Sequence, residues 1–205
     1  MDNIVFSDPF FQLLHQNDIQ YCVMELDEDA QMIDLFVHPD SNAHFIEIMK
    51  RNHYKMVGTS TDEYAFIYRL EPDIFWEAPN GSKIHSSCQM SCVSLSNLSK
   101  CKLPLDQKIQ QSIWENRVWN EQNRCWTLCA EDYLIHILTA CIFDQKRFDQ
   151  KSIRWITESG VDLKSKSLIE KLEGVFFRFT PELIHHLEES DYQNIINNYR
   201  TFRDY

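Results

Sequence analysis

Runs of apolar residues divide this chain into a first half rich in predicted strands and a second half of predicted helices. Residues 19–26 and 31–37 are short, almost continuous apolar runs joined by an acidic connection, a pattern typical of two neighbouring buried strands. Helices are predicted on both sides of this pair. Over residues 7–16 and 43–52 the apolar residues gather on one helical face. The first segment begins with the capping sequence Ser7-Asp8-Pro9, and the second follows a turn that contains Pro39.

Further strands are predicted after residue 54, where aromatic and β-branched residues dominate. The segments expected to be strands are residues 54–57, 64–70, 73–77 and 83–93. Pro79, Asn80 and Gly81 form a turn signal that predicts a hairpin between the last two segments. Residues 94–102 are polar and have no period, so a linker is expected there.

The second half of the chain is predicted to be helical. Asp106 caps a segment that continues to Val118, and residues 129–143 repeat their apolar positions with a helical period. The other expected helices cover residues 148–157, 164–172, 181–188 and 192–202. This order predicts an α+β protein. An α/β domain is expected over residues 1–100 and a helical domain over residues 101–205.

Composition narrows the classes of function. Only four glycines occur in 205 residues, and no Gly-rich dinucleotide or P-loop motif can be written. The net charge of −11 disfavours binding to a nucleic acid backbone, and no apolar run is long enough to predict a membrane helix.

Glu131 and Asp132 fall in the first turn of a predicted helix, where the helix dipole favours carboxylates, so neither requires a catalytic role.

The cysteines indicate reduced thiols. Seven are present, an odd number, with apolar neighbours and no signal peptide pattern, so a cytoplasmic location is expected. The spacing of Cys88 with Cys92, and of Cys125 with Cys129, could suggest zinc near His85. Buried structural cysteines are the favoured interpretation, because the two-residue spacing of a zinc knuckle is absent.

Asp34 is the strongest candidate for chemistry, because it is a single carboxylate in the otherwise apolar strand at residues 31–37. Burying a charge is costly unless it is paired, hydrogen-bonded or bound to a metal. Asp34 could therefore bind a cation, or it could be a structural carboxylate paired with Arg69 or Lys83. His85 has two interpretations as well, a base or phosphate-binding group and an ordinary core histidine.

The order helix, strand, strand, helix at the start of the chain resembles that of a nucleotidyltransferase-like domain. Residues 19–24, residues 32–39 and the helix after Ser41 carry this resemblance. Residues 126–138 resemble the helix that opens the C-terminal bundle of bacterial members, with residues 148–156 as its partner. The resemblance implies a nucleotidyltransferase-like mixed β-sheet domain followed by a C-terminal helical domain.

The resemblance also implies a chemistry, the Mg²⁺-dependent transfer of a nucleoside monophosphate to a hydroxyl of a small molecule or a protein. In this family, two or three carboxylates hold the metal ions that stabilise the attacking and leaving oxygens. Asp34 would be the catalytic carboxylate and main Mg²⁺ ligand, and Lys83 and His85 would lie near the nucleotide phosphates. The carboxylates that could assist as metal ligands are Glu25, Asp27 and Glu77.

The chain departs from the family pattern at three places. Met32 stands where the first carboxylate of the strand pair is expected, Lys83 stands where a later carboxylate is expected, and residues 25–27 replace a Gly-Ser turn. The alternative is therefore a catalytically inactive member that acts as a binding or scaffold subunit for a protein partner. Its working surface would be an exposed apolar patch among the C-terminal helices. A partner that sequesters a toxin or a peptide-modifying enzyme is an equally open version of this alternative.

Overall fold

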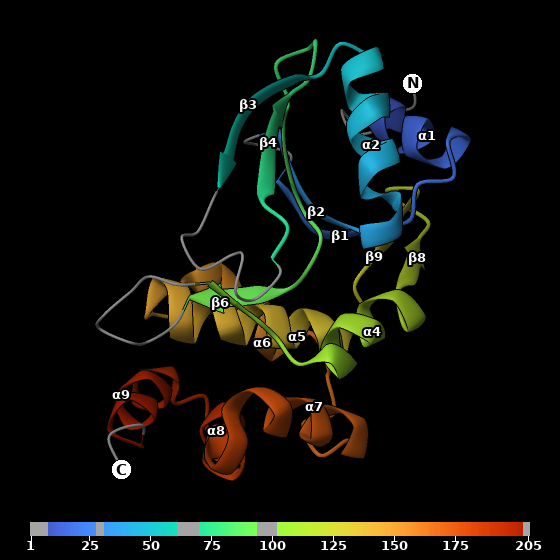
Figure 1. Cartoon of the computed structure of the whole chain (residues 1–205). Coiled ribbons are helices and arrows are strands. Elements are labelled where there is room, and N and C mark those ends of the chain that lie inside the picture. The colour runs from blue at the N-terminus through green and yellow to red at the C-terminus, as the bar shows by residue number, and fades with distance from the viewer. Residues whose placement is uncertain (1–7, 28–30, 61–69, 94–101, 203–205) are drawn as a thin grey trace. The chain divides into compact units, whose positions relative to one another are not determined.

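The computed structural model describes residues 8–27, 31–60, 70–93 and 102–202, and it is a mixed α+β protein, as predicted (Figure 1). The chain divides into two compact units. The first contains residues 1–90 and 110–129, and the second contains residues 91–109 and 130–205. The predicted domain boundary between residues 100 and 101 lies outside the described residues.

The first four elements of the first unit confirm the predicted order. They are α1 (Asp8–Gln16), β1 (Tyr21–Asp27), β2 (Met32–Val37) and α2 (Pro39–Arg51). Helix α2 begins four residues before its predicted start at residue 43, because Pro39 occupies the first turn and the His38 ring caps it. Nδ1 of His38 accepts a hydrogen bond from the backbone N–H of Asp40.

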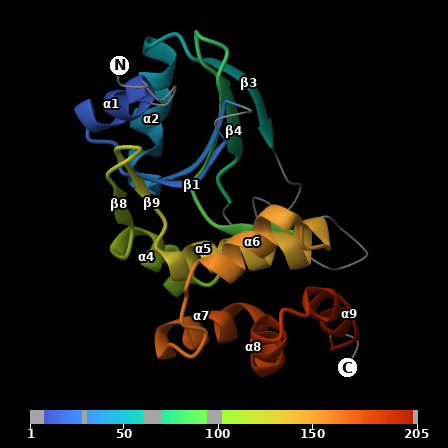
Figure 2. The same cartoon turned by 180° about the vertical axis from the view of Figure 1, so that it is seen from behind.

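A seven-stranded mixed sheet in the order β3-β4-β5-β2-β1-β9-β8 forms the centre of the first unit. Its remaining strands are β3 (Lys55–Ser60), β4 (Asp73–Glu77), β5 (Lys83–Ser87), β8 (Val118–Asn120) and β9 (Cys125–Thr127). Strand β2 pairs antiparallel with β1 and parallel with β5. Helices α1 and α2 lie together on one side of this sheet, as both views show (Figures 1 and 2).

The buried core of the first unit lies between these helices and the sheet. Ile33, Leu35 and Val37 of β2 point into it at every second position. Trp76 of β4 is almost fully buried, and its Nε1–H donates to Oγ of Ser86 at 3.1 Å. A bulge at residue 24 of β1 and another at residue 57 of β3 shift the strand register.

The predicted strand at residues 83–93 is wrong as a single element. Strand β5 ends at Ser87, and β6 (Ser91–Val93) pairs with β7 (Lys102–Pro104) in a separate two-stranded sheet. The physical reason lies at Met90, whose backbone N–H and C=O both bond to the side-chain amide of Gln110, at 2.9 and 2.7 Å. A side chain therefore takes the ladder bonds that a continuous strand would need.

Other predicted boundaries also differ from the observed ones. The helix expected to reach Val118 is α4 (Gln107–Glu115), and Val118 opens the β8–β9 hairpin, which was not predicted. Strand β3 extends to Ser60, beyond the predicted end at residue 57. Of the predicted strand at residues 64–70, only Leu70 is described, and it is not in a strand. Most of the predicted linker at residues 94–102 also lies outside the described residues.

The helices of the second unit confirm the helical prediction. They are α5 (Ala130–Thr139), the π-helix η1 (Ala140–Gln145), α6 (Gln150–Glu158), α7 (Lys166–Phe176), the 3₁₀ helix η2 (Phe177–Phe179), α8 (Thr180–Glu188) and α9 (Tyr192–Phe202). Rings of Phe143, Phe176 and Phe179 pack around Tyr199, with centroid distances of 5.5, 6.0 and 5.1 Å. In the described part of the chain, no helix has both the length and the apolar character needed to cross a membrane.

Candidate functional site

Three adjacent strands of the sheet bring Asp34, His85 and Asp73 together. Asp34 of β2 is the direct register partner of His85 on β5, and His85 is the partner of Phe75 on β4. Side chains alternate between the faces of a strand, so these residues lie on the face opposite to the buried core. We call the group of Asp34, His85 and Asp73 the sheet cluster.

The imidazole of His85 lies between the two carboxylates of the sheet cluster. Its Nδ1 is 3.1 Å from Oδ1 of Asp34, and its Nε2 is 3.7 Å from Oδ2 of Asp73. Oγ of Ser60 donates a hydrogen bond to that same oxygen of Asp73 at 2.9 Å. The ring of Phe75 stacks on the imidazole with a centroid distance of 4.7 Å and an interplanar angle of 14°. These contacts fix the orientation of the imidazole.

The surroundings of His85 favour its protonated form. Burial alone would lower its pKa, but the hydrogen bond with Asp34 and the charges of Asp34 and Asp73 outweigh this effect and raise the pKa from 6.5 to about 9. His85 is therefore a cation at neutral pH, with both ring nitrogens as donors. Its side chain is 24% exposed and that of Asp34 is 21% exposed, so solvent reaches both.

The residues predicted for the site all lie on this face, in two neighbouring cross-strand rows. In the first row, Glu25 of β1 is opposite Asp34, which is opposite His85. The second row lies two residues away along the strands, in the order Asp27, Met32, Lys83 and Glu77. A single face of the sheet therefore carries all six predicted residues.

Sharing a face does not by itself group the carboxylates into a metal site. Asp34 is hydrogen-bonded to His85, and in the second row Lys83 lies between Met32 and Glu77. Within residues 8–27, 31–60, 70–93 and 102–202, no three His, Cys, Asp or Glu side chains are grouped so that they could hold a metal ion. The Mg²⁺ ligand roles of Asp34, Glu25, Asp27 and Glu77, and the phosphate-binding roles of Lys83 and His85, stay predictions.

Asp73 is the member of the site that sequence reasoning missed. It was recognised only as the first residue of a predicted strand. The signal was its carboxylate at the same alternation position as Phe75 and Glu77, which assigns it to the outer face. Its closeness to His85 depends on the pairing between β4 and β5, which periodicity does not reveal.

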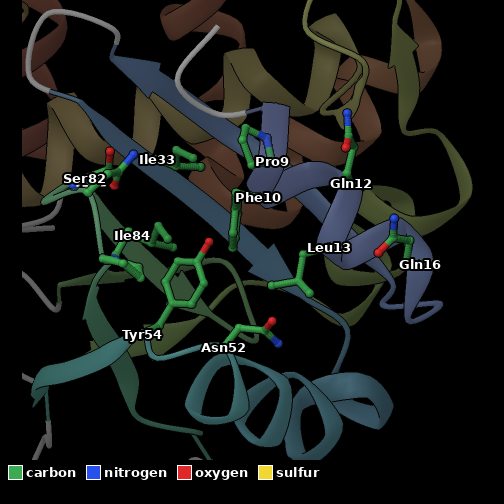
Figure 3. Close-up of a pocket in the computed structure, with 13 residues that line it drawn as sticks. Pro9, Phe10, Gln12, Leu13, Gln16, Ile33, Asn52, Tyr54, Ser82 and Ile84 are labelled. Atoms are coloured by element: carbon green, nitrogen blue, oxygen red, sulfur yellow. Dashed lines mark hydrogen bonds between the residues drawn. The ribbon is translucent and has the colours of Figure 1, made fainter. Parts of the chain in front are cut away.

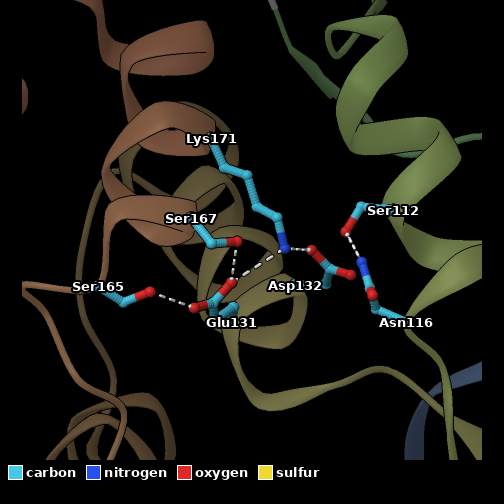
Figure 4. Close-up of polar contacts among 7 residues, drawn as sticks. All are labelled: Ser112, Asn116, Glu131, Asp132, Ser165, Ser167 and Lys171. Carbon is cyan, nitrogen blue, oxygen red and sulfur yellow. Dashed lines mark hydrogen bonds and ion pairs between the residues drawn. The ribbon is translucent and has the colours of Figure 1, made fainter.

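A second group of charges lies within the helical unit, formed by Glu131 and Asp132 of α5 and Lys171 of α7 (Figure 4). We call it the helix cluster. Nζ of Lys171 is 2.7 Å from Oδ1 of Asp132 and 3.2 Å from Oε2 of Glu131. Hydroxyls of Ser165 and Ser167 donate to the two oxygens of Glu131, each at 2.8 Å. The helix dipole alone, which was our explanation from the sequence, is therefore incomplete.

The two carboxylates of the helix cluster differ in exposure. The side chain of Asp132 is fully buried, whereas that of Glu131 is 26% exposed. Burial opposes ionisation of Glu131, but the bonds from both serines and from Lys171 prevail and lower its pKa. These contacts account for the cluster as an ion pair between two helices of one unit.

The described cysteines are free, and all except Cys129 are buried. Burial raises the pKa of Cys88, Cys92 and Cys125 to about 12 in each case, with nearby carboxylates adding to the effect at the first two. Thiols with such values stay protonated at neutral pH, which is the behaviour of structural cysteines.

Comparisons with known proteins provide no assignment for this site: no protein-family model matches the chain, and no curated protein matches it.

Proposed function

We propose that this chain is a non-catalytic member of the nucleotidyltransferase-like fold that acts as a binding subunit for a protein partner. The observation that carries this proposal is the His85 imidazolium, which is hydrogen-bonded to the carboxylate that would otherwise be the main Mg²⁺ ligand. In the proposed function, Asp34 holds a histidine cation and has no metal.

Electrostatics supports this assignment. A Mg²⁺ ion at Asp34 would lie beside a positive charge only 3.1 Å from the same carboxylate, so His85 would have to lose its proton or move. Mg²⁺ also needs several oxygen ligands in near-octahedral geometry. Met32 and Lys83, the residues that face each other in the neighbouring row, offer no such oxygen. This pair therefore adds no Mg²⁺ ligand beside Asp34.

One exposed aromatic side chain of the helical unit supports a protein partner there, although a larger apolar patch among the C-terminal helices stays a prediction. Phe177, at the junction of α7 and η2, has 70% of its surface exposed. Its backbone has φ +50° and ψ −127°, in a region that a phenylalanine adopts only with strain. Exposed aromatic side chains are frequent anchors of protein interfaces. Phe177 is therefore the residue that we expect to contact the partner.

Thermal melting with Mg²⁺ and each nucleoside triphosphate tests the absence of catalysis. A ligand that binds only the native state raises the melting temperature by mass action. We expect no Mg²⁺-dependent rise with any of the four nucleotides. A rise that disappears in Asp34→Asn would overturn the proposal and support the enzyme.

A double variant provides the positive control for this test. Met32→Asp would place a carboxylate two residues from Asp34 on β2. His85→Asp would place another directly across from Asp34 on β5. This protein should gain a Mg²⁺-dependent rise in melting temperature, because three carboxylates would then converge. Met32→Asn with His85→Asn has nearly the same shape without the charges, and it should gain none.

Affinity isolation from the native host tests the binding function. The wild type should recover a partner that Phe177→Ala does not, while both proteins melt at the same temperature because the ring is exposed. Equal recovery by the two proteins would exclude Phe177 as the anchor.

One observation favours the catalytic alternative. The six predicted residues share one face of the sheet, and on that face the side chain of Asp34 is open to solvent. Its function would be Mg²⁺-dependent transfer of a nucleoside monophosphate to a hydroxyl. The melting experiment separates it from the binding subunit, because only the enzyme requires nucleotide and metal together.

A further inference from the structure

A cavity of about 480 Å³ lies in the first unit, on the core side of the sheet (Figure 3). Helix α1, the end of α2 and the turn between β4 and β5 provide its walls. Ile33 and Ile84 also line it, and each is the immediate neighbour of Asp34 or His85 along its strand. Successive side chains of a strand point to opposite faces, so the sheet separates this cavity from the sheet cluster. Its volume is within the range of small-molecule sites.

The cavity has an uncharged lining. None of its 13 described lining residues is Asp, Glu, Lys, Arg or His. Tyr54 can ionise in principle, but burial raises its pKa and keeps the hydroxyl neutral. A charged ligand would lose hydration here and find no counter-charge. The lining therefore favours a ligand without formal charge and disfavours a nucleotide phosphate.

Apolar side chains line the middle of the cavity. Phe10 of α1 and Tyr54 have ring centroids 5.9 Å apart and an interplanar angle of 54°. Figure 3 shows both rings directed into the space between Ile84 and Leu13. Flat apolar surfaces of this kind pack well against a planar ring.

A buried hydroxyl without a partner supplies the second, independent indication of a ligand. Ser82 lines the cavity and is 4% exposed, yet its Oγ has no hydrogen-bond partner among the described residues. Nearly all buried polar groups in proteins are hydrogen-bonded, so this one requires an explanation. Asn52 and Asn80 also line the cavity; Nδ2 of Asn52 donates to the carbonyl of Ile48 and Oδ1 of Asn80 accepts from the backbone N–H of Ser82, so each amide is already partly engaged.

We propose that this cavity binds an uncharged small molecule in which a planar ring carries an amide-type group. The ring packs against the edges of Phe10 and Tyr54 that line the cavity, and the amide-type group bonds to Oγ of Ser82. This site is independent of the proposed function, because it lies on the other face of the sheet and uses none of the residues of the sheet cluster.

Three probes of similar size and different charge test the proposed ligand class, namely benzamide, benzoate and benzylammonium. Each is titrated into the ¹⁵N-labelled full chain, and binding is followed by backbone chemical shifts. Benzamide should bind in the millimolar range and shift residues of α1 and the β4–β5 turn, while both ions bind at least about tenfold more weakly. If benzamide does not bind, or if either ion binds equally well, the proposal is wrong.

Two buried serines, Ser82 just before β5 and Ser86 within it, provide a matched pair of variants. Ser82→Ala removes the unpartnered hydroxyl, so it should weaken benzamide binding by about three- to tenfold without lowering the melting temperature. Ser86 does not line the cavity, and its Oγ accepts from Trp76 and donates to the carbonyl of Ile74. Ser86→Ala should lower the melting temperature by a few degrees and leave benzamide affinity unchanged.

The opposite result for this pair would overturn the proposal. A merely structural Ser82 would lower the melting temperature when it is replaced and would not change benzamide affinity. Tyr54→Phe is the third variant, because it keeps the ring and removes a hydroxyl that has no hydrogen-bond partner among the described residues. This variant should also stay folded. The ratio of its affinity for benzamide to its affinities for benzoate and benzylammonium should be the same as in the wild type, which supports the neutral lining.

Discussion

The sheet cluster and the helix cluster each consist of two carboxylates around one cation. The cation is His85 in the sheet cluster and Lys171 in the helix cluster. Their cations differ in chemistry. A lysine in an ion pair keeps its charge across the usual pH range, whereas a histidine loses its proton within it. Their burial differs as well, because Asp132 is fully enclosed while Asp34 and His85 are open to solvent.

This difference separates permanent ion pairing from conditional ion pairing. The helix cluster joins α5 to α7 through the ammonium group of Lys171. The sheet cluster depends on a proton on His85, which ties its strength to pH. Composition alone does not distinguish the two cases, because each reads as scattered acidic and basic residues in the sequence.

Removing the lysine should have the largest effect. Lys171→Met leaves the fully buried Asp132 carboxylate without its cation, and breaking such a pair costs about 3–5 kcal/mol in unfolding free energy. Urea denaturation followed by circular dichroism measures this loss. Lys166→Met is the control, because Lys166 is an exposed neighbour on the same helix whose ion pair with Glu170 is at the surface. Equal losses in the two variants would contradict the buried pairing.

Raising the pH should weaken the sheet cluster, with the second largest loss of unfolding free energy. The pKa of His85 is higher in the folded state than its ordinary value of 6.5, so its contribution is complete below pH 6.5 and is lost as the pH rises through about 9. At most about 3 kcal/mol of stability should disappear over this range. Urea denaturation at each pH measures it. In His85→Gln this dependence should be absent, whereas replacing the exposed His44 by Gln should leave it intact.

Replacing Asp34 should shift the titration of His85 itself. Asp34→Asn removes one of the two carboxylates that stabilise the imidazolium, so the pKa of His85 should fall toward 6.5, with a loss of about 1–2 kcal/mol in stability. Proton NMR of the imidazole as a function of pH measures the pKa. Asp40→Asn changes a carboxylate beside the more exposed His38 and should leave the His85 titration unchanged. An unaltered pKa in Asp34→Asn would mean that Asp73 alone stabilises the cation.

Lowering the pH should weaken the helix cluster, and this loss of stability should be the smallest of the four effects. The direction of the pH dependence is opposite to that of the sheet cluster. The pKa of Glu131 is lower in the folded state, so its contribution is present above its ordinary value of 4.5 and is lost as the pH falls through the folded value. Urea denaturation between pH 5 and pH 3 should show a smaller acid loss in Glu131→Gln than in the wild type. A larger acid loss in the variant would contradict the role of Ser165 and Ser167.

Local patterns were sufficient to predict much of the fold. The helix over residues 192–202 and the strand over residues 73–77 were predicted with their observed ends, because apolar period and turn residues act within the segment itself.

What the sequence could not predict depends on partners far away in the chain. The Gln110 amide that interrupts the strand at Met90 comes from another element, 20 residues later. Likewise, the position of His85 between Asp34 and Asp73 follows from the register of three strands, and a shift of one residue would turn the side chains to the other face. Short strands such as β8 and β9 have too few residues for a period to be visible.

The bulge at residue 57 has a consequence for the behaviour of the protein in concentrated solution. Among the described strands, β3 and β8 form the two edges of the large sheet, and β3 exposes the apolar side chains of Met56 and Val57. A long, flat edge of that kind would recruit a further strand from another molecule and start aggregation. Because the bulge breaks the regular spacing of backbone donors and acceptors along β3, and because β8 has only three residues, neither edge is a good template for such growth.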